Sequence, residues 1–172
     1  MSLEDLGNIG EFVAAVAVLV TLGYLAVQIR QNTRSVRASM YQSLVESVVN
    51  FNTTFTQDSD LARAYFEGLE DLYGLSEADR TRVVFALFSH FQIFQSMFYQ
   101  RRLFTIEPEY WESWRVLILS YYAMPGVQQW WQIRQNVFSK EFRKFLETEK
   151  LDHPMLSAPE LVRRLSPKQD AP

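Results

Sequence analysis

The stretch FVAAVAVLVTLGYLAVQI, from Phe12 to Ile29, decides how this chain is organised. Ile9 and Gly10 extend it backwards, so the apolar run covers residues 9–29, and Glu11 is its one charged residue. An α-helix rises about 1.5 Å per residue, and about twenty apolar residues cross the roughly 30 Å hydrocarbon core of a bilayer. The run therefore predicts a single transmembrane helix over residues 9–29.

Two other interpretations of the run are a cleavable signal peptide and a buried or interfacial helix. A signal peptide carries positive charge before its apolar segment, whereas the residues before this run contain acids and no Lys or Arg. A helix at the surface of a soluble core has one polar face, and this run is apolar all round. The charge pattern and the missing polar face both favour the transmembrane interpretation.

Basic residues follow the run instead of preceding it, at Arg30, Arg34 and Arg37. By the positive-inside rule, the flank that carries them stays in the cytoplasm. The predicted topology has residues 1–8 outside the membrane and the rest of the chain in the cytoplasm. The three arginines are expected at the membrane surface, where each ion pair with an anionic lipid headgroup is worth about 1 kcal/mol.

Small or polar residues form one stripe along the predicted transmembrane helix. Their spacings of four, three, four and seven keep them on one helical face. They are Gly10, Ala14, Ala17, Thr21 and Gln28. Small residues let helices approach closely in lipid, and Thr or Gln can hydrogen-bond across the contact. The stripe predicts self-association, although Ala and Gly are also common in membrane helices without that role.

The composition of the chain argues against nucleic-acid binding and against cysteine chemistry. The first eleven residues hold three acids and no bases, so the rest of the chain balances 17 basic residues against 17 acidic ones. A balanced domain has no basic footprint for nucleic acid. The chain has no Cys, which excludes disulfides, thiol catalysis and thiolate metal sites. Scarce Gly and Pro with 15% aromatic residues are typical of packed helices.

Residues 30–150 predict an all-α cytoplasmic domain of about five to six helices, and residues 151–172 a polar, Pro-containing tail. The transmembrane helix is expected to continue to about residue 57, because apolar residues recur there at steps of three or four. Further helices are predicted over residues 61–73, 76–103, 110–122, 127–138 and 139–149, with a short one at 158–165. Ser76 and Ser139 are predicted N-caps, and Met124-Pro125-Gly126 a break.

Catalytic and metal-binding motifs are not found in the sequence. The two histidines, His90 and His153, lie in no metal-binding helical pattern. No nucleophile elbow, P-loop or dinucleotide-binding glycine pattern is present. The acids at 67, 70 and 71 are best interpreted as a solvated face. We therefore expect no catalytic residue, cofactor or metal, and we expect His90 to be partly buried with a hydrogen-bond partner. The roles of His90 and Glu46 stay open.

Aromatic residues are dense in the second half of the chain. Candidates for a ligand pocket or an aromatic core are Phe94, Trp111, Trp114, Trp130 and Trp131. Such side chains line ligand sites, but they also simply fill cores. Trp130 and Trp131 are adjacent, and adjacent residues point about 100 degrees apart on a helix. At least one of them is therefore expected to be partly exposed.

The segment LGNIGEFVAAVAVLVTLGYLAVQIRQNT, residues 6–33, resembles the opening of a family of short bacterial single-span membrane proteins. Pro125-Gly126, Trp130-Trp131 and the Phe-rich stretch 138–145 are similar to the same group. The resemblance implies a bacterial inner-membrane location. It implies no activity and transfers no functional residue.

Three functional hypotheses follow. The first is a membrane-anchored interaction or assembly protein that self-associates and binds lipid and a membrane-protein partner. The second is a homo-oligomeric ion channel, with Glu11 at its mouth and Thr21 and Gln28 along its wall. The third is a membrane-tethered sensor that binds an apolar ligand among its aromatic residues. An enzyme is the weakest class, and a nucleic-acid partner is not expected.

Overall fold

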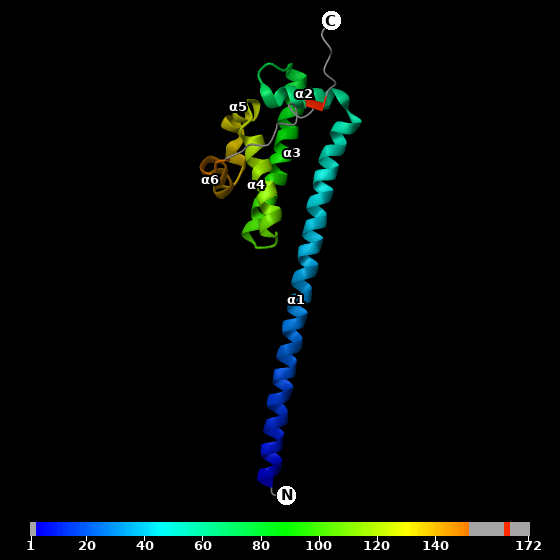
Figure 1. The fold of residues 1–172 in the computed structure, drawn as a ribbon, viewed down its shortest axis with the longest axis vertical. Coiled ribbons are helices and arrows are strands. Elements are labelled where there is room, and N and C mark those ends of the chain that lie inside the picture. The colour runs from blue at the N-terminus through cyan, green and yellow to red at the C-terminus, as the bar shows by residue number, and fades with distance from the viewer. Residues whose placement is uncertain (1–2, 152–163, 166–172) are drawn as a thin grey trace. The chain divides into compact units, whose positions relative to one another are not determined.

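A computed structural model describes residues 3–151 and 164–165 of the chain (Figure 1). These residues form an all-α fold with no strand among them. The elements are α1 (Leu3–Gln57), α2 (Ser59–Glu70), α3 (Glu77–Arg102), α4 (Pro108–Tyr122), α5 (Pro125–Arg134), the 3₁₀ helix η1 (Gln135–Val137) and α6 (Lys140–Thr148). The predicted all-helical class is confirmed. The short helix expected over residues 158–165 lies outside the described residues, except for its last two.

The chain divides into two compact units, Met1–Gln42 and Ser43–Pro172. The first contains most of α1, and the second contains the end of α1 together with α2 to α6. The predicted continuation of the apolar helix to residue 57 is confirmed, because α1 runs without a break from Leu3 to Gln57. We call residues 43–151 the helical domain.

Side-chain caps begin three of the helices. The Asp58 carboxylate accepts from the Leu61 N–H at 2.8 Å at the start of α2. The Ser76 hydroxyl accepts from the Asp79 N–H at the start of α3. The Ser139 hydroxyl accepts from the Phe142 N–H at the start of α6. Each bond satisfies an amide that the helix leaves without an internal partner. Both predicted serine caps are confirmed.

Helix α2 ends at Glu70, three residues before the predicted end at 73. Asp71 is extended, and its carboxylate accepts from the Tyr73 N–H at 3.1 Å. The Leu72 N–H donates to the side chain of Gln129 at 2.8 Å. The side chains of Asp71 and Gln129 thus take over amides that a longer helix would have used.

The Met124-Pro125-Gly126 sequence is the start of α5 and not a break before it. Pro125 occupies the first turn, where a missing N–H costs nothing. Gly126 is buried where α5 crosses α2, and a Cβ built on it would lie 1.9 Å from the carbonyl oxygen of Gly68. The predicted start at residue 127 was therefore wrong by two residues. The glycine is there for close backbone packing instead of for a turn.

Helix α3 is the centre of the helical domain, and α4 lies beside it (Figure 1). Each of the other α-helices brings a ring close to a ring of α3. These ring pairs are Phe51 with His90, Tyr65 with His90, Trp114 with Phe94, Trp130 with Phe91 and Phe142 with Phe98. The buried face of α3 comprises Val83, Leu87, Phe91, Phe94 and Met97.

Replacing Gly126 with Ala tests the α2–α5 crossing. Ala is ordinarily favoured over Gly inside a helix by about 1 kcal/mol. Here the added methyl group meets backbone that cannot rotate away, so Gly126→Ala is expected to lower the free energy of unfolding by about 1–3 kcal/mol. Denaturant unfolding followed by tryptophan fluorescence measures the change.

Gly23→Ala is the matched control, because a Cβ at Gly23 has no neighbour within 4 Å. It should leave the unfolding of the helical domain unchanged. Equal stability of Gly126→Ala and Gly23→Ala would contradict a close approach of α5 to the backbone of α2.

Candidate functional site

The five aromatic candidates separate into different parts of the helical domain. Trp130 and Trp131 are both buried, with 1% and 3% of their surfaces exposed. The expectation that one of them is partly exposed was therefore wrong. Trp131 stacks on Phe138 at 5.0 Å between ring centroids, and Trp130 contacts Phe91 at 5.1 Å. The segment from η1 to α6 covers the side of α5 that a lone helix would leave open.

Trp111 belongs to a second cluster, against Phe145 and Phe98. Phe94 and Trp114 belong to different helices, α3 and α4, and the structure brings their ring centroids to 6.3 Å from each other. Phe94 is fully buried, while Trp114 is half-buried on α4. Phe94 packs against His90, and Trp114 and His90 both line a cavity, which makes this part of the domain the candidate site.

The cavity has a volume of about 210 Å³ and lies between α1, α3 and α4. Its lining residues carry no formal charge at neutral pH. They are Val48, Phe51 and Asn52 of α1, His90 and Ile93 of α3, and Trp114, Leu117 and Tyr121 of α4. Asn52 is exposed and the other lining residues are half-buried, so Asn52 marks the mouth.

His90 is held by a hydrogen bond between its Nδ1 and the Tyr65 hydroxyl, 2.7 Å apart. Its ring packs against Phe94 at 4.2 Å, Phe51 at 4.5 Å and Tyr121 at 4.6 Å between centroids. Burial lowers the pKa of His90 to about 3, so the imidazole is neutral at pH 7. The expectation of a partly buried histidine with a hydrogen-bond partner is confirmed.

The second ring nitrogen of His90, Nε2, has no hydrogen-bond partner among the described residues. Neighbouring tyrosines do not supply charge either, because burial raises the pKa of Tyr65 and of Tyr121. The site therefore offers a neutral polar atom within aromatic walls. That arrangement suits binding of a neutral molecule, and an imidazole with this pKa is a weak base at neutral pH.

Sequence reasoning did not identify Tyr65, Val48 or Phe51 as neighbours of His90. Tyr65 is separated from His90 by 25 residues and lies on another helix. The one available signal was that Tyr65 follows Ala64 on the apolar face of an amphipathic helix. This position indicates a buried tyrosine, and the hydroxyl of a buried tyrosine usually has a hydrogen-bond partner. The identity of that partner is set by the way α2 packs on α3.

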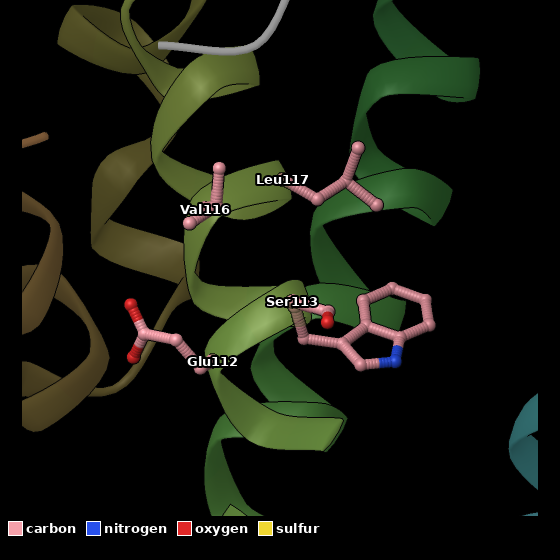
Figure 2. Close-up of a pocket in the computed structure, with 5 residues that line it drawn as sticks. Glu112, Ser113, Val116 and Leu117 are labelled. Carbon is pink, nitrogen blue, oxygen red and sulfur yellow. The ribbon is translucent and has the colours of Figure 1, made fainter. Parts of the chain in front are cut away.

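A second hollow, with a volume of about 500 Å³, lies along α4 and shares Trp114 and Leu117 with the His90 cavity. It is an open, shallow groove lined by Glu112, Ser113, Trp114, Val116 and Leu117 (Figure 2). Arg115 donates to the Glu112 carboxylate at 2.7–3.0 Å, and this hydrogen bonding lowers the pKa of Glu112. The groove is an exposed helix surface, less enclosed than the His90 cavity.

The predicted self-association stripe is exposed along its whole length, from Gly10 to Gln28. A Cβ built on Gly10 meets no atom within 4 Å, so nothing inside the chain requires glycine there. The Thr21 hydroxyl donates to the Ala17 carbonyl at 2.8 Å, which leaves its oxygen to accept from a neighbour. Arg30, Arg34 and Arg37 are exposed on the following turns of α1.

Among the described residues, no group of three or more His, Asp or Glu side chains is placed to hold a metal ion. Glu67, one of the acids interpreted as a solvated face, forms an ion pair with Arg63 at 3.1 Å on the exposed face of α2. His153 lies outside the described residues, so its surroundings are not placed.

Comparison with known proteins gives no match to a protein family, to a curated protein or to a solved structure. The resemblance of residues 6–33 to short bacterial single-span proteins therefore stands on the sequence pattern alone.

Acid should destabilise the domain through His90. Its folded pKa of about 3 lies below the unfolded value near 6.5, so between these values the unfolded chain binds a proton that the folded chain does not. Stability is therefore lost as the pH falls through this window, by up to about 1.4 kcal/mol per pH unit. Unfolding curves at pH 7 and pH 5 measure the loss.

His90→Gln is the matched variant, because Gln does not titrate. The fall in unfolding free energy from pH 7 to pH 5 should be about 2 kcal/mol larger in the native chain than in this variant. Equal losses in both proteins would show that His90 titrates normally in the folded state.

Proposed function

We propose that the chain is a membrane-anchored, helical interaction protein that crosses the membrane once with residues 9–29. The observation that carries the proposal is an uninterrupted helix whose apolar surface is exposed all round. Within Gly10–Gln57, the most apolar 18-residue window has none of its residues buried. A helix satisfies its own backbone groups, which is the condition for crossing a bilayer.

The exposed apolar area is too large for water to be its natural surroundings. Phe12, Leu19, Val20 and Ile29 each expose between 66% and 70% of their surface. Each Å² of apolar surface removed from water contributes about 25 cal/mol. The hydrocarbon core of a bilayer covers all faces of such a helix at once, and one partner helix would cover only one face.

The proposed orientation places the N-terminus outside and the helical domain in the cytoplasm of a bacterial cell. Arg30, Arg34 and Arg37 follow the apolar run and support this orientation. The continuity of α1 means that the helix leaving the membrane is also the first helix of the domain. The domain would then display its surfaces to partners close to the membrane.

The proposed interaction role includes self-association through the face that carries Gly10, Ala14 and Ala17. Small residues let two backbones come close enough for extensive van der Waals contact in lipid. The open space around Gly10 is consistent with this, because no contact within the chain accounts for a glycine there.

Membrane integration is tested by carbonate extraction of cell membranes that contain the full chain, with intact mass as a second readout. The native chain should stay in the membrane pellet at its full mass. The double variant Val16→Arg with Leu19→Arg should shift into the soluble fraction, since each Arg near a helix centre costs about 2.5–3.5 kcal/mol. Ile133→Arg, on an exposed position of α5, is the control and should stay in the pellet.

Two results would contradict the proposal. Release of the native chain by carbonate would rule out a transmembrane helix. Loss of the N-terminal residues from the isolated protein would identify the run as a cleaved signal peptide. Orientation is tested in the same cells, because the chain has no Cys and single cysteines can be introduced. A Cys at Ser2 should react with an impermeant maleimide in intact cells, and a Cys at Ile133 should react after lysis.

Self-association is tested by native mass spectrometry of the full chain in nanodiscs. Gly10→Leu and Ala17→Leu should each shift the protein towards monomer by separating the helices. The matched controls are Gly23→Leu and Ala15→Leu, which make the same replacements on the other side of the helix. Loss of oligomer in the controls as well would mean that the stripe is not the contact, and a monomeric native chain would remove the self-association proposal.

A further inference from the structure

We propose that the cavity beside His90 binds a small, neutral, aromatic molecule that carries one hydrogen-bonding group. The inference rests on residues 48–121 of the helical domain alone. It does not depend on membrane anchoring, and either proposal can fail without the other.

The size of the cavity sets the size of the ligand. An apolar cavity of about 150 Å³ is large enough to hold benzene. The volume of about 210 Å³ next to His90 therefore fits a molecule somewhat larger than one benzene ring. A fused two-ring molecule such as indole is the natural probe of this size.

The walls of the cavity select an aromatic molecule. The rings of Phe51, Trp114 and Tyr121 come from two helices, and Ile93 and Leu117 complete the apolar surface. Pairs of aromatic rings contribute about 0.5–1.5 kcal/mol each beyond the burial of their area. A flat ring between α1 and α4 would make several such contacts at once.

The electrostatics of the cavity exclude an ion. The lining residues carry no formal charge, and burial keeps His90 neutral by holding its pKa at about 3. A buried ion without a partner of opposite charge is strongly unfavourable. Charged relatives of the same ring system should therefore bind much more weakly than the neutral molecule.

His90 supplies the specific polar contact. Its Nδ1 is engaged by the Tyr65 hydroxyl, which can donate to it or accept from it. Its Nε2 has no partner among the described residues, and the ring lines the cavity. With indole bound, Nε2 would accept from the indole N–H while Nδ1–H donates to Tyr65. A donor on the ligand would pair with this nitrogen at the cavity wall, and a typical hydrogen bond of this kind contributes about 1 kcal/mol.

The two histidines of the chain allow the site to be observed directly. The full chain, with isotope-labelled histidine, is placed in nanodiscs and titrated with indole while the imidazole signals are followed by NMR. The signals of His90 should move in a saturable manner, and those of His153 provide an internal reference. Tryptamine, a cation, and indole-3-carboxylate, an anion, should bind at least tenfold more weakly.

A variant that fills the cavity separates binding at this site from uptake of indole by the lipid. Leu117→Trp should weaken the saturable shift of His90 at least tenfold, and Val48→Phe serves the same purpose if the first variant does not fold. Ile133→Trp, exposed on α5, adds the same side chain away from the site and should bind indole normally.

The proposal is overturned if the His90 signals do not saturate, which is the result expected for a cavity occupied only by water. It is also overturned if the filled variants respond like the native chain, or if the charged relatives bind as well as indole. A ligand retained through purification that displaces indole would support it and would identify the natural molecule.

Discussion

Phe91 and Phe94 on α3 have no exposed surface, and rings from all the other α-helices gather around the helix that carries them. The interaction that orders the domain is this burial of aromatic side chains on one central helix. Each large ring contributes the burial of its apolar surface and adds preferred edge-to-face contacts with its neighbours. Because rings of all the other α-helices contact α3, a change in its position would affect α1 and α6 alike.

One close approach of backbone complements the packing of large rings. Gly126 brings α5 so close to the backbone of Gly68 on α2 that a Cβ on Gly126 would have no room. That separation in turn lets the Gln129 side chain accept from the Leu72 N–H and donate to the Asp71 carboxylate. The end of α2 is thus determined by α5, which follows it by more than fifty residues. In this core, aromatic rings fill the space between helices, and glycine lets two helix backbones come into contact.

Local signals in the sequence were sufficient for most helix boundaries. Ser76 and Ser139 are recognisable caps because a hydroxyl followed by an apolar periodic stretch satisfies a first-turn amide. The apolar spacing of residues 44–55 correctly predicted that α1 continues. Such features depend on residues within one or two turns, so the sequence alone contains them.

Non-local features were missed for the opposite reason. The burial of both Trp130 and Trp131 depends on Phe138 and Phe142, which fold back over the far side of α5. The pairing of His90 with Tyr65, and the cavity beside it, depend on how three helices meet. Pro125-Gly126 has the composition of a turn, and only the nearness of Gly68 reveals it as a helix start. In each case the deciding atoms belong to a distant segment.

The order of the elements along the chain has a consequence for synthesis. Phe51 and Phe55 at the end of α1 contact Tyr65, which is made soon afterwards. Phe51 also packs against His90, and Tyr121 lines the same cavity, but both of these residues are made later. Until α3 has been made, the end of α1 has only α2 to cover it. Domains generally fold as units during synthesis, and incompletely covered apolar helices attract other chains. The end of α1 therefore stays incompletely covered until α4 has been made.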